Sequence, residues 1–114
     1  MILTNEKIGS TLVASIAGQV NSANASGLES QLLALVDNGE HQWVLDLGRL
    51  EYISSAGLRV VLMLAKRIRE NQGQLVLCGM HPHVREVFDI SGFLAILTVV
   101  DTREQALAET NLKE

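Results

Sequence analysis

Residues 51–64 read EYISSAGLRVVLML and contain two adjacent serines and a glycine ahead of a long apolar run. The apolar residues after its two serines recur at the spacing of one helical face: Leu58, Val61, Leu62, Ala65 and Ile68. The basic residues Arg59, Lys66, Arg67 and Arg69 mostly point in other directions. The stretch therefore predicts a helix that begins near Ser54 and Ser55, packs its apolar stripe against a sheet and ends at Gln72-Gly73.

Short runs with strand composition lie on both sides of this helix. They cover residues 3–8, 11–17, 43–47, 75–78 and 96–100. We expect residues 11–17 to end at Gly18, to pair with the short edge strand 3–8, and to lead into a turn over residues 18–21. Gly48 is expected to end the strand that contains Trp43, whose ring we assign to core or sheet-edge packing.

Three further helices are expected. Ser22 is the predicted cap of the first, whose apolar residues are Ala25, Leu28, Leu32, Leu35 and Val36 and whose end lies near Asn38-Gly39. His81-Pro82 opens the next helix, with Val84, Val87 and Phe88 on its buried face and Gly92 as its left-handed cap. The run 101–104 resembles a capping box for a last helix that carries Ala106 and Leu107. The alternation of strands and helices predicts an α/β sheet with helical crossovers after a first hairpin.

Size and composition place the chain among ordinary globular proteins. Its 114 residues suit one domain, expected to cover residues 1–114, and 47% hydrophobic content with 19% charged residues excludes a disordered chain. A formal net charge of −4 disfavours nucleic-acid binding, so we expect a protein partner. The N-terminus does not resemble a signal peptide and no window reaches the length of a membrane span, which predicts a cytoplasmic protein.

Signatures of enzyme chemistry are absent from the sequence. There is no phosphate-binding loop, no pair of cysteines and no serine in a nucleophile elbow. Cys78 is expected to be a buried, inert thiol. His81 and His83 could form a metal or small-ligand site, but with Pro82 between them and no nearby third ligand we interpret them as surface residues at a helix start. We assign no catalytic residue, metal ligand or cofactor.

Ser54 and Ser55 have two possible uses. One serine suffices to cap the helix by accepting a hydrogen bond from a free backbone N–H. The second hydroxyl then lies in the first helical turn, where the helix dipole favours a phosphate, and Arg59 lies one turn later on the same face. Ala56 and Gly57 leave the approach to this hydroxyl uncrowded. The residues alone do not decide whether the serine pair only caps the helix or also carries a phosphorylation switch.

The wider motif resembles a known family. Residues 52–60, YISSAGLRV, preceded by VLDL at 44–47 and followed by FDISGF at 88–93, resemble the STAS domain of bacterial anti-sigma factor antagonists, and the resemblance spans essentially the whole chain. It implies a mixed sheet of four to five strands backed by about four helices. It also implies a partner-switching cycle in which the unphosphorylated protein binds an anti-sigma factor serine kinase, and a serine phosphatase of the metal-dependent class reverses the phosphorylation.

Carried onto this chain, the motif makes Ser55 the phosphoacceptor and predicts partner contacts at Asn21, Ser54, Ser55, Ala56, Gly57 and Arg59. Family members often have Asp at the positions of Asn21 and Ser54. The loss of both acids favours a rival interpretation, a STAS adaptor that is not phosphorylated, such as a subunit bound to the ATPase of a lipid-transport complex. The transporter-tail form of the domain is disfavoured because no membrane segment is present.

Overall fold

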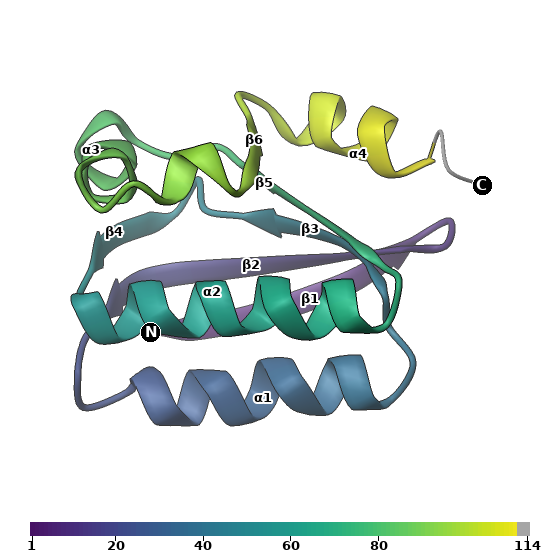
Figure 1. Ribbon diagram of the computed structural model, residues 1–114, viewed down its shortest axis with the longest axis horizontal. Coiled ribbons are helices and arrows are strands. Elements are labelled where there is room, and N and C mark those ends of the chain that lie inside the picture. The colour runs from purple at the N-terminus through teal and green to yellow at the C-terminus, as the bar shows by residue number, and fades with distance from the viewer. Residues whose placement is uncertain (112–114) are drawn as a thin grey trace.

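A computed structural model describes residues 1–111 (Figure 1). The strands are β1 (Ile2–Ile8), β2 (Thr11–Val20), β3 (Gln42–Asp46), β4 (Leu50–Ile53), β5 (Gln74–Cys78) and β6 (Thr98–Val100). The helices are α1 (Ala25–Asp37), α2 (Ser55–Glu70), α3 (Pro82–Ile90) and α4 (Arg103–Asn111), with a short 3₁₀ helix at Phe93–Ala95. The described residues thus form the α/β arrangement that the sequence predicts.

The strands form one mixed sheet in the order β1-β2-β3-β5-β6. β1 and β2 are antiparallel, whereas β2, β3, β5 and β6 are parallel to one another. β4 pairs in parallel with the last residues of β2, beyond a register shift between Gly18 and Gln19. The sheet therefore has six strands, one more than the upper limit of the prediction, and the additional strand is β4.

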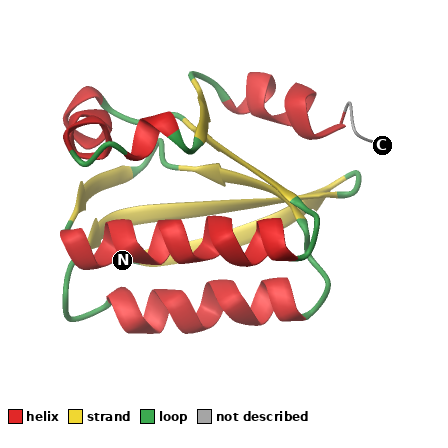
Figure 2. Ribbon diagram, in the orientation of Figure 1, coloured by secondary structure: helices red, strands yellow, loops and turns green. Residues whose placement is uncertain are grey.

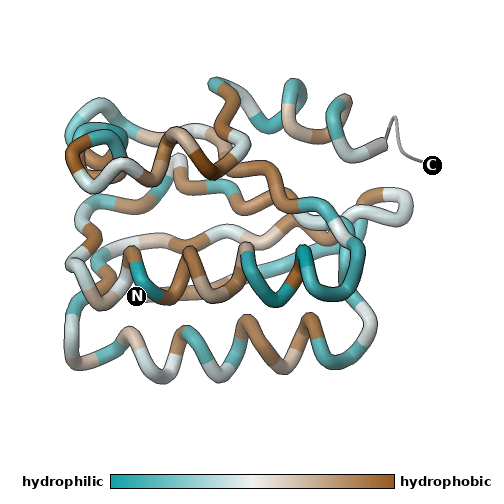
Figure 3. Tube along the Cα trace, in the orientation of Figure 1, coloured by the Kyte–Doolittle hydropathy of each residue, from teal (hydrophilic) through white to brown (hydrophobic). Residues whose placement is uncertain are grey.

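Helices cover both faces of the sheet (Figures 1 and 2). α1 and α2 run side by side beneath one face, where Leu28, Leu32, Leu64 and Trp43 are fully buried. α4 covers the opposite face through Ala106, which packs with Val13, Val44, Val76 and Cys78. Each fully buried aliphatic side chain stabilises the fold by about 1.5–3 kcal/mol. Hydrophilic residues gather instead on the C-terminal half of α2 (Figure 3).

Several predicted boundaries are wrong at β2 and α1. Gly18, with φ of +91°, does not end the strand, because the register shift beside it lets β2 continue to Val20 and pair with β4. The turn therefore begins at Asn21 and not at Gly18. Ser22 does not cap α1 either, since Asn24 is the cap residue and the Asn21 side chain accepts the backbone hydrogen bonds there.

Three later expectations also change. The buried face of α2 contains Val60 and Leu64, whereas Leu62 and Ala65 are only half-buried. The final strand starts at Thr98, after the 3₁₀ helix, so Ile96 is exposed. At α4 the capping pair is Thr102 and Gln105: the Thr102 hydroxyl accepts from Gln105 N, and Gln105 Oε1 accepts from Thr102 N, each at 3.1 Å.

Other expectations are confirmed. Trp43 is fully buried and its indole N–H donates to the Glu40 carbonyl at 2.6 Å. α3 starts with Pro82, and Gly92 has the predicted left-handed conformation, with φ of +79°. Cys78 is fully buried, and its pKa is raised to about 12. Burial is the larger cause and the negative charge of Asp46 the next.

Candidate functional site

The two adjacent serines occupy different positions at the start of α2. Ser54 is the N-cap: its hydroxyl accepts from Gly57 N at 3.2 Å, and its own N–H donates to the Val20 carbonyl at 2.9 Å. Ser55 is the first helical residue, is exposed, and its hydroxyl forms no hydrogen bond with any described residue. Capping is thus assigned to Ser54, and the Ser55 hydroxyl is left open to solvent.

The electrostatic surroundings of Ser55 favour an anion. The first N–H groups of a helix lack intrahelical partners and carry the positive end of the helix dipole. The first turn of α2 contains no acidic residue. Arg59 is exposed one turn later, and among the described residues it takes part in no ion pair. A phosphoryl group on Ser55 would therefore meet backbone N–H groups and a guanidinium within reach.

Asn21 reaches this region because of strand register. Val20 pairs with Ile53 in the parallel β2–β4 ladder, so the residues that follow each strand, Asn21 and Ser54, emerge at the same end of the sheet. Asn21 Oδ1 accepts from the backbone N–H groups of Ala23 and Asn24, at 2.9 and 3.1 Å. This side-chain oxygen therefore holds the turn before α1 and is not free to orient the Ser55 hydroxyl.

Gly57 differs from the other predicted contact residues because it faces inward. It is buried, and a Cβ placed on it would lie 2.7 Å from side-chain atoms of both Ile53 and Val20. Glycine is needed here so that α2 can approach the ends of β2 and β4. Gly57 supports the site from beneath and does not present a surface, whereas Ala56 beside it is half-buried.

Tyr52 was not predicted as a site residue. It lies on β4, two residues before the cap, and its side chain is 50% exposed. The sequence feature that could have pointed to Tyr52 is its position immediately before Ile53-Ser54-Ser55. Tyr52 lies three residues before Ser55 in the chain, and both residues are exposed.

The two histidines at the start of α3 bind backbone carbonyls. The Nε2–H of His81 donates to the Gly48 carbonyl and that of His83 to the Glu51 carbonyl, each at 2.7 Å. Their rings are stacked with centroids 6.0 Å apart. These contacts attach α3 to the turn after β3, through Gly48, and to β4, through Glu51. Within residues 1–111 there is no group of three or more His, Cys, Asp or Glu side chains arranged to hold a metal.

The comparison with protein families identifies the chain. The STAS domain family matches residues 3–106, which is most of the sequence. This chain belongs to the STAS domain family. The six-stranded mixed sheet and the helix that begins at Ser55 are therefore the STAS fold.

Individual proteins similar to this STAS domain carry a regulatory name. The chain is 62% identical over 108 residues to a Bordetella bronchiseptica protein named as an anti-sigma factor antagonist, BtrV, covering 95% of this chain and 93% of that protein. A further relative, the anti-sigma F factor antagonist of Paenibacillus polymyxa, is 26% identical over 86% of this chain and 85% of its own. The named functions of these relatives are regulatory and not enzymatic.

Solved structures agree on the fold. A crystal structure named as an anti-sigma factor antagonist from Thermotoga maritima superposes with a TM-score of 0.91 at 20% identity, over 96% of this chain and 94% of that one. At this identity the likeness concerns the fold alone. None of the helices formed by residues 1–111 has the length and apolar character that crossing a membrane requires.

Proposed function

We propose that this STAS domain is an anti-sigma factor antagonist that is switched by phosphorylation of Ser55. The main observation in support of this proposal is that the two serines have different structural roles. Ser54 caps α2, so the exposed Ser55 hydroxyl can be modified without removing the cap. The name of the 62% identical relative supports the regulatory role.

In this cycle the unphosphorylated domain binds an anti-sigma factor that is also a serine kinase. The kinase transfers the γ-phosphoryl group of ATP to Ser55 Oγ, which loses its proton as the new O–P bond forms and ADP leaves. A serine phosphatase of the metal-dependent class hydrolyses the phosphoserine and returns the hydroxyl. SpoIIAA of Bacillus, a protein of the same fold, is known in a phosphorylated form.

The charge of the phosphoryl group accounts for release. Phosphoserine adds about −1.5 to −2 charges near neutral pH. If the binding surface includes the start of α2, this charge is placed in a partly desolvated interface with the kinase. A loss of about 3–4 kcal/mol of binding free energy weakens a complex by a few hundredfold. Release then requires no change of fold.

The test is incubation of the purified domain with ATP and the kinase encoded by a neighbouring gene, followed by peptide mass spectrometry. We expect one phosphoryl group on Ser55, and no modification of the Ser55→Ala variant. Modification of Ser54 with Ser55 unmodified would show that the site assignment is wrong.

A STAS adaptor without phosphorylation is the second candidate function. Two observations favour it. The side-chain amide oxygen of Asn21 already accepts two backbone hydrogen bonds, and the first turn of α2 contains no acidic residue. Neither residue 21 nor residue 54 therefore supplies a carboxylate near Ser55. Co-purification with the ATPase of a transport complex, in place of a serine kinase, would select this function.

A further inference from the structure

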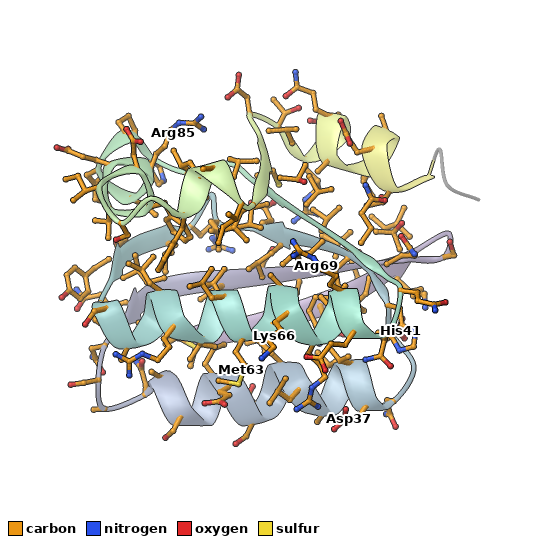
Figure 4. All side chains as sticks on the ribbon, viewed as in Figure 1. Asp37, His41, Met63, Lys66, Arg69 and Arg85 are labelled. Atoms are coloured by element: carbon orange, nitrogen blue, oxygen red, sulfur yellow. The ribbon has the colours of Figure 1, made fainter. Side chains whose placement is uncertain are left out.

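The N-terminal halves of α1 and α2 enclose a groove beside Ser55. The two helices run in the same direction, and Figure 4 shows Met63 between them. The groove has a volume of about 200 Å³, and its lining includes Ser26, Glu29, Ala56, Arg59, Val60 and Met63. Ala56 directly follows Ser55, so the groove is continuous with the surface that carries the proposed phosphorylation site.

Side-chain size explains why the groove is open. Ala25 and Ala56 contribute only methyl groups, and Val60 at its base is 4% exposed. The groove therefore has an apolar floor, and the space above this floor is open. Met63, a flexible and polarizable side chain, can adjust to a side chain that enters.

The charges along the two helices differ between their ends. At the C-terminal ends, Arg67 Nη1 of α2 lies 3.1 Å from Asp37 Oδ1 of α1 and bridges the helices. Arg59 and Glu29 lie eight residues earlier on the same two helices and both line the groove, yet within the described chain neither takes part in an ion pair. The groove thus has an apolar floor between one unpaired cation and one unpaired anion.

We propose that this groove receives one apolar side chain of the anti-sigma factor, with a partner carboxylate on Arg59 and a partner basic group on Glu29. The inference rests on the proposed function, since the same partner must contact Ser55. An apolar anchor buried in a pocket and flanked by complementary charges is the usual centre of a protein interface.

Arg59 connects the groove to the switch. It lies one helical turn after Ser55, so a phosphoryl group on Ser55 competes with the partner carboxylate for the same guanidinium. Phosphorylation then removes a favourable contact from the groove rim in addition to placing charge in the interface. The Arg59→Ala variant should bind the kinase more weakly, and its affinity should fall less on phosphorylation than that of the wild type.

The test fills the groove without touching Ser55. Ser26→Phe places an aromatic ring at an exposed helical position on the rim, and the matched control Gln31→Phe places the same ring at an exposed position of α1 that does not line the groove. Binding to the purified kinase is measured by calorimetry, and folding by thermal melting. We expect Ser26→Phe to weaken binding at least about tenfold and Gln31→Phe to stay within about twofold of the wild type, with both variants melting normally.

The outcomes separate the two proposals. If the wild type binds the kinase and Ser26→Phe binds equally well, the groove assignment is wrong while the proposed function stands. If the wild type does not bind the kinase, the proposed function and the groove assignment both fail. If the wild type is a dimer that Ser26→Phe dissociates in sedimentation velocity, the groove is occupied by a second copy of the chain and the proposal is wrong.

Discussion

The two serines of the SSAG motif have separable physical roles, and stability measurements distinguish them. Ser54→Ala removes the acceptor for Gly57 N, so the free energy of unfolding should fall by about 1 kcal/mol. Ser55→Ala removes an exposed hydroxyl without a hydrogen bond, so its effect should stay within about 0.5 kcal/mol. Urea unfolding of both variants checks the contrast. An equal loss in the two variants would contradict the assignment of the cap.

Gly57 offers a second test at the scale of one residue. Gly57→Ala brings a methyl group to 2.7 Å from Ile53 and Val20, and overpacking of this kind should lower the free energy of unfolding by about 1–3 kcal/mol. Gly27 is the matched control, because it lies in α1 and an added Cβ would meet no atom within 4 Å apart from its chain neighbours and the backbone of its own helix. Gly27→Ala should stabilise the domain by about 0.5–1 kcal/mol. Thermal melting should therefore show shifts of opposite sign, and a gain in both variants would refute close packing at Gly57.

Among the elements, α2 is predictable from the sequence and β4 is not. The start of α2 follows from a serine cap and an apolar stripe, which are both local signals. Its buried face is predicted in part: Leu58, Val61 and Ile68 are buried as expected, whereas Val60 and Leu64 are buried in place of Leu62 and Ala65. β4 has four residues, two of them exposed, and it exists because the register shift at Gly18 lets β2 continue to meet it. No local pattern contains that information.

α4 depends on a cluster of polar contacts around Arg103. Its Nε lies 2.9 Å from Asp46 Oδ2, and its two Nη atoms bind Glu6 and Ser15 at 3.1 and 3.2 Å. The hydrogen bond to Asp46 raises the pKa of Arg103, so this side chain is charged throughout the ordinary pH range. The cluster ties α4 to strands β1, β2 and β3.

Arg103→Gln should therefore destabilise the domain by about 1–2 kcal/mol, since it breaks the charge-assisted contacts with Asp46 and Glu6 while both acids remain partly solvated. Arg69→Gln is the control, because Arg69 is exposed on α2 and has no ion pair among the described residues. Chemical denaturation measures both variants. Equal stability of the two variants would show that the Arg103 cluster does not hold α4.

At the scale of the whole molecule, the buried Cys78 predicts a dependence of stability on pH. Its pKa of about 12 in the folded protein lies above the ordinary thiol value of 9.0, so the unfolded chain loses the thiol proton first as pH rises. The contribution of the thiol to stability is complete below pH 9.0 and declines as pH rises toward 12, by at most about 1.4 kcal/mol per pH unit. The wild type should thus lose stability over this range faster than Cys78→Ala. Parallel slopes in urea titrations would contradict an ionisable buried thiol.

The site was only partly predictable for a reason that applies to the molecule as a whole. Ser55 and Arg59 are four residues apart in the sequence, so a helical pattern relates them directly. Asn21 was included through the family resemblance, but its actual hydrogen bonds depend on the turn after a strand that proved longer than expected. The groove combines Glu29 of α1 with Met63 of α2, and only the parallel packing of the two helices brings these residues together.

The proposed function depends on a hydroxyl at the start of a helix that becomes an anion and thereby changes which partner binds. The most direct test is the calorimetric affinity of the anti-sigma factor kinase for the domain with Ser55 free and with Ser55 fully phosphorylated, with a melting curve for each form. We expect binding a few hundredfold weaker after phosphorylation and closely similar melting temperatures. Equal affinity of the two forms, or weaker binding accompanied by loss of the folded state, would contradict it.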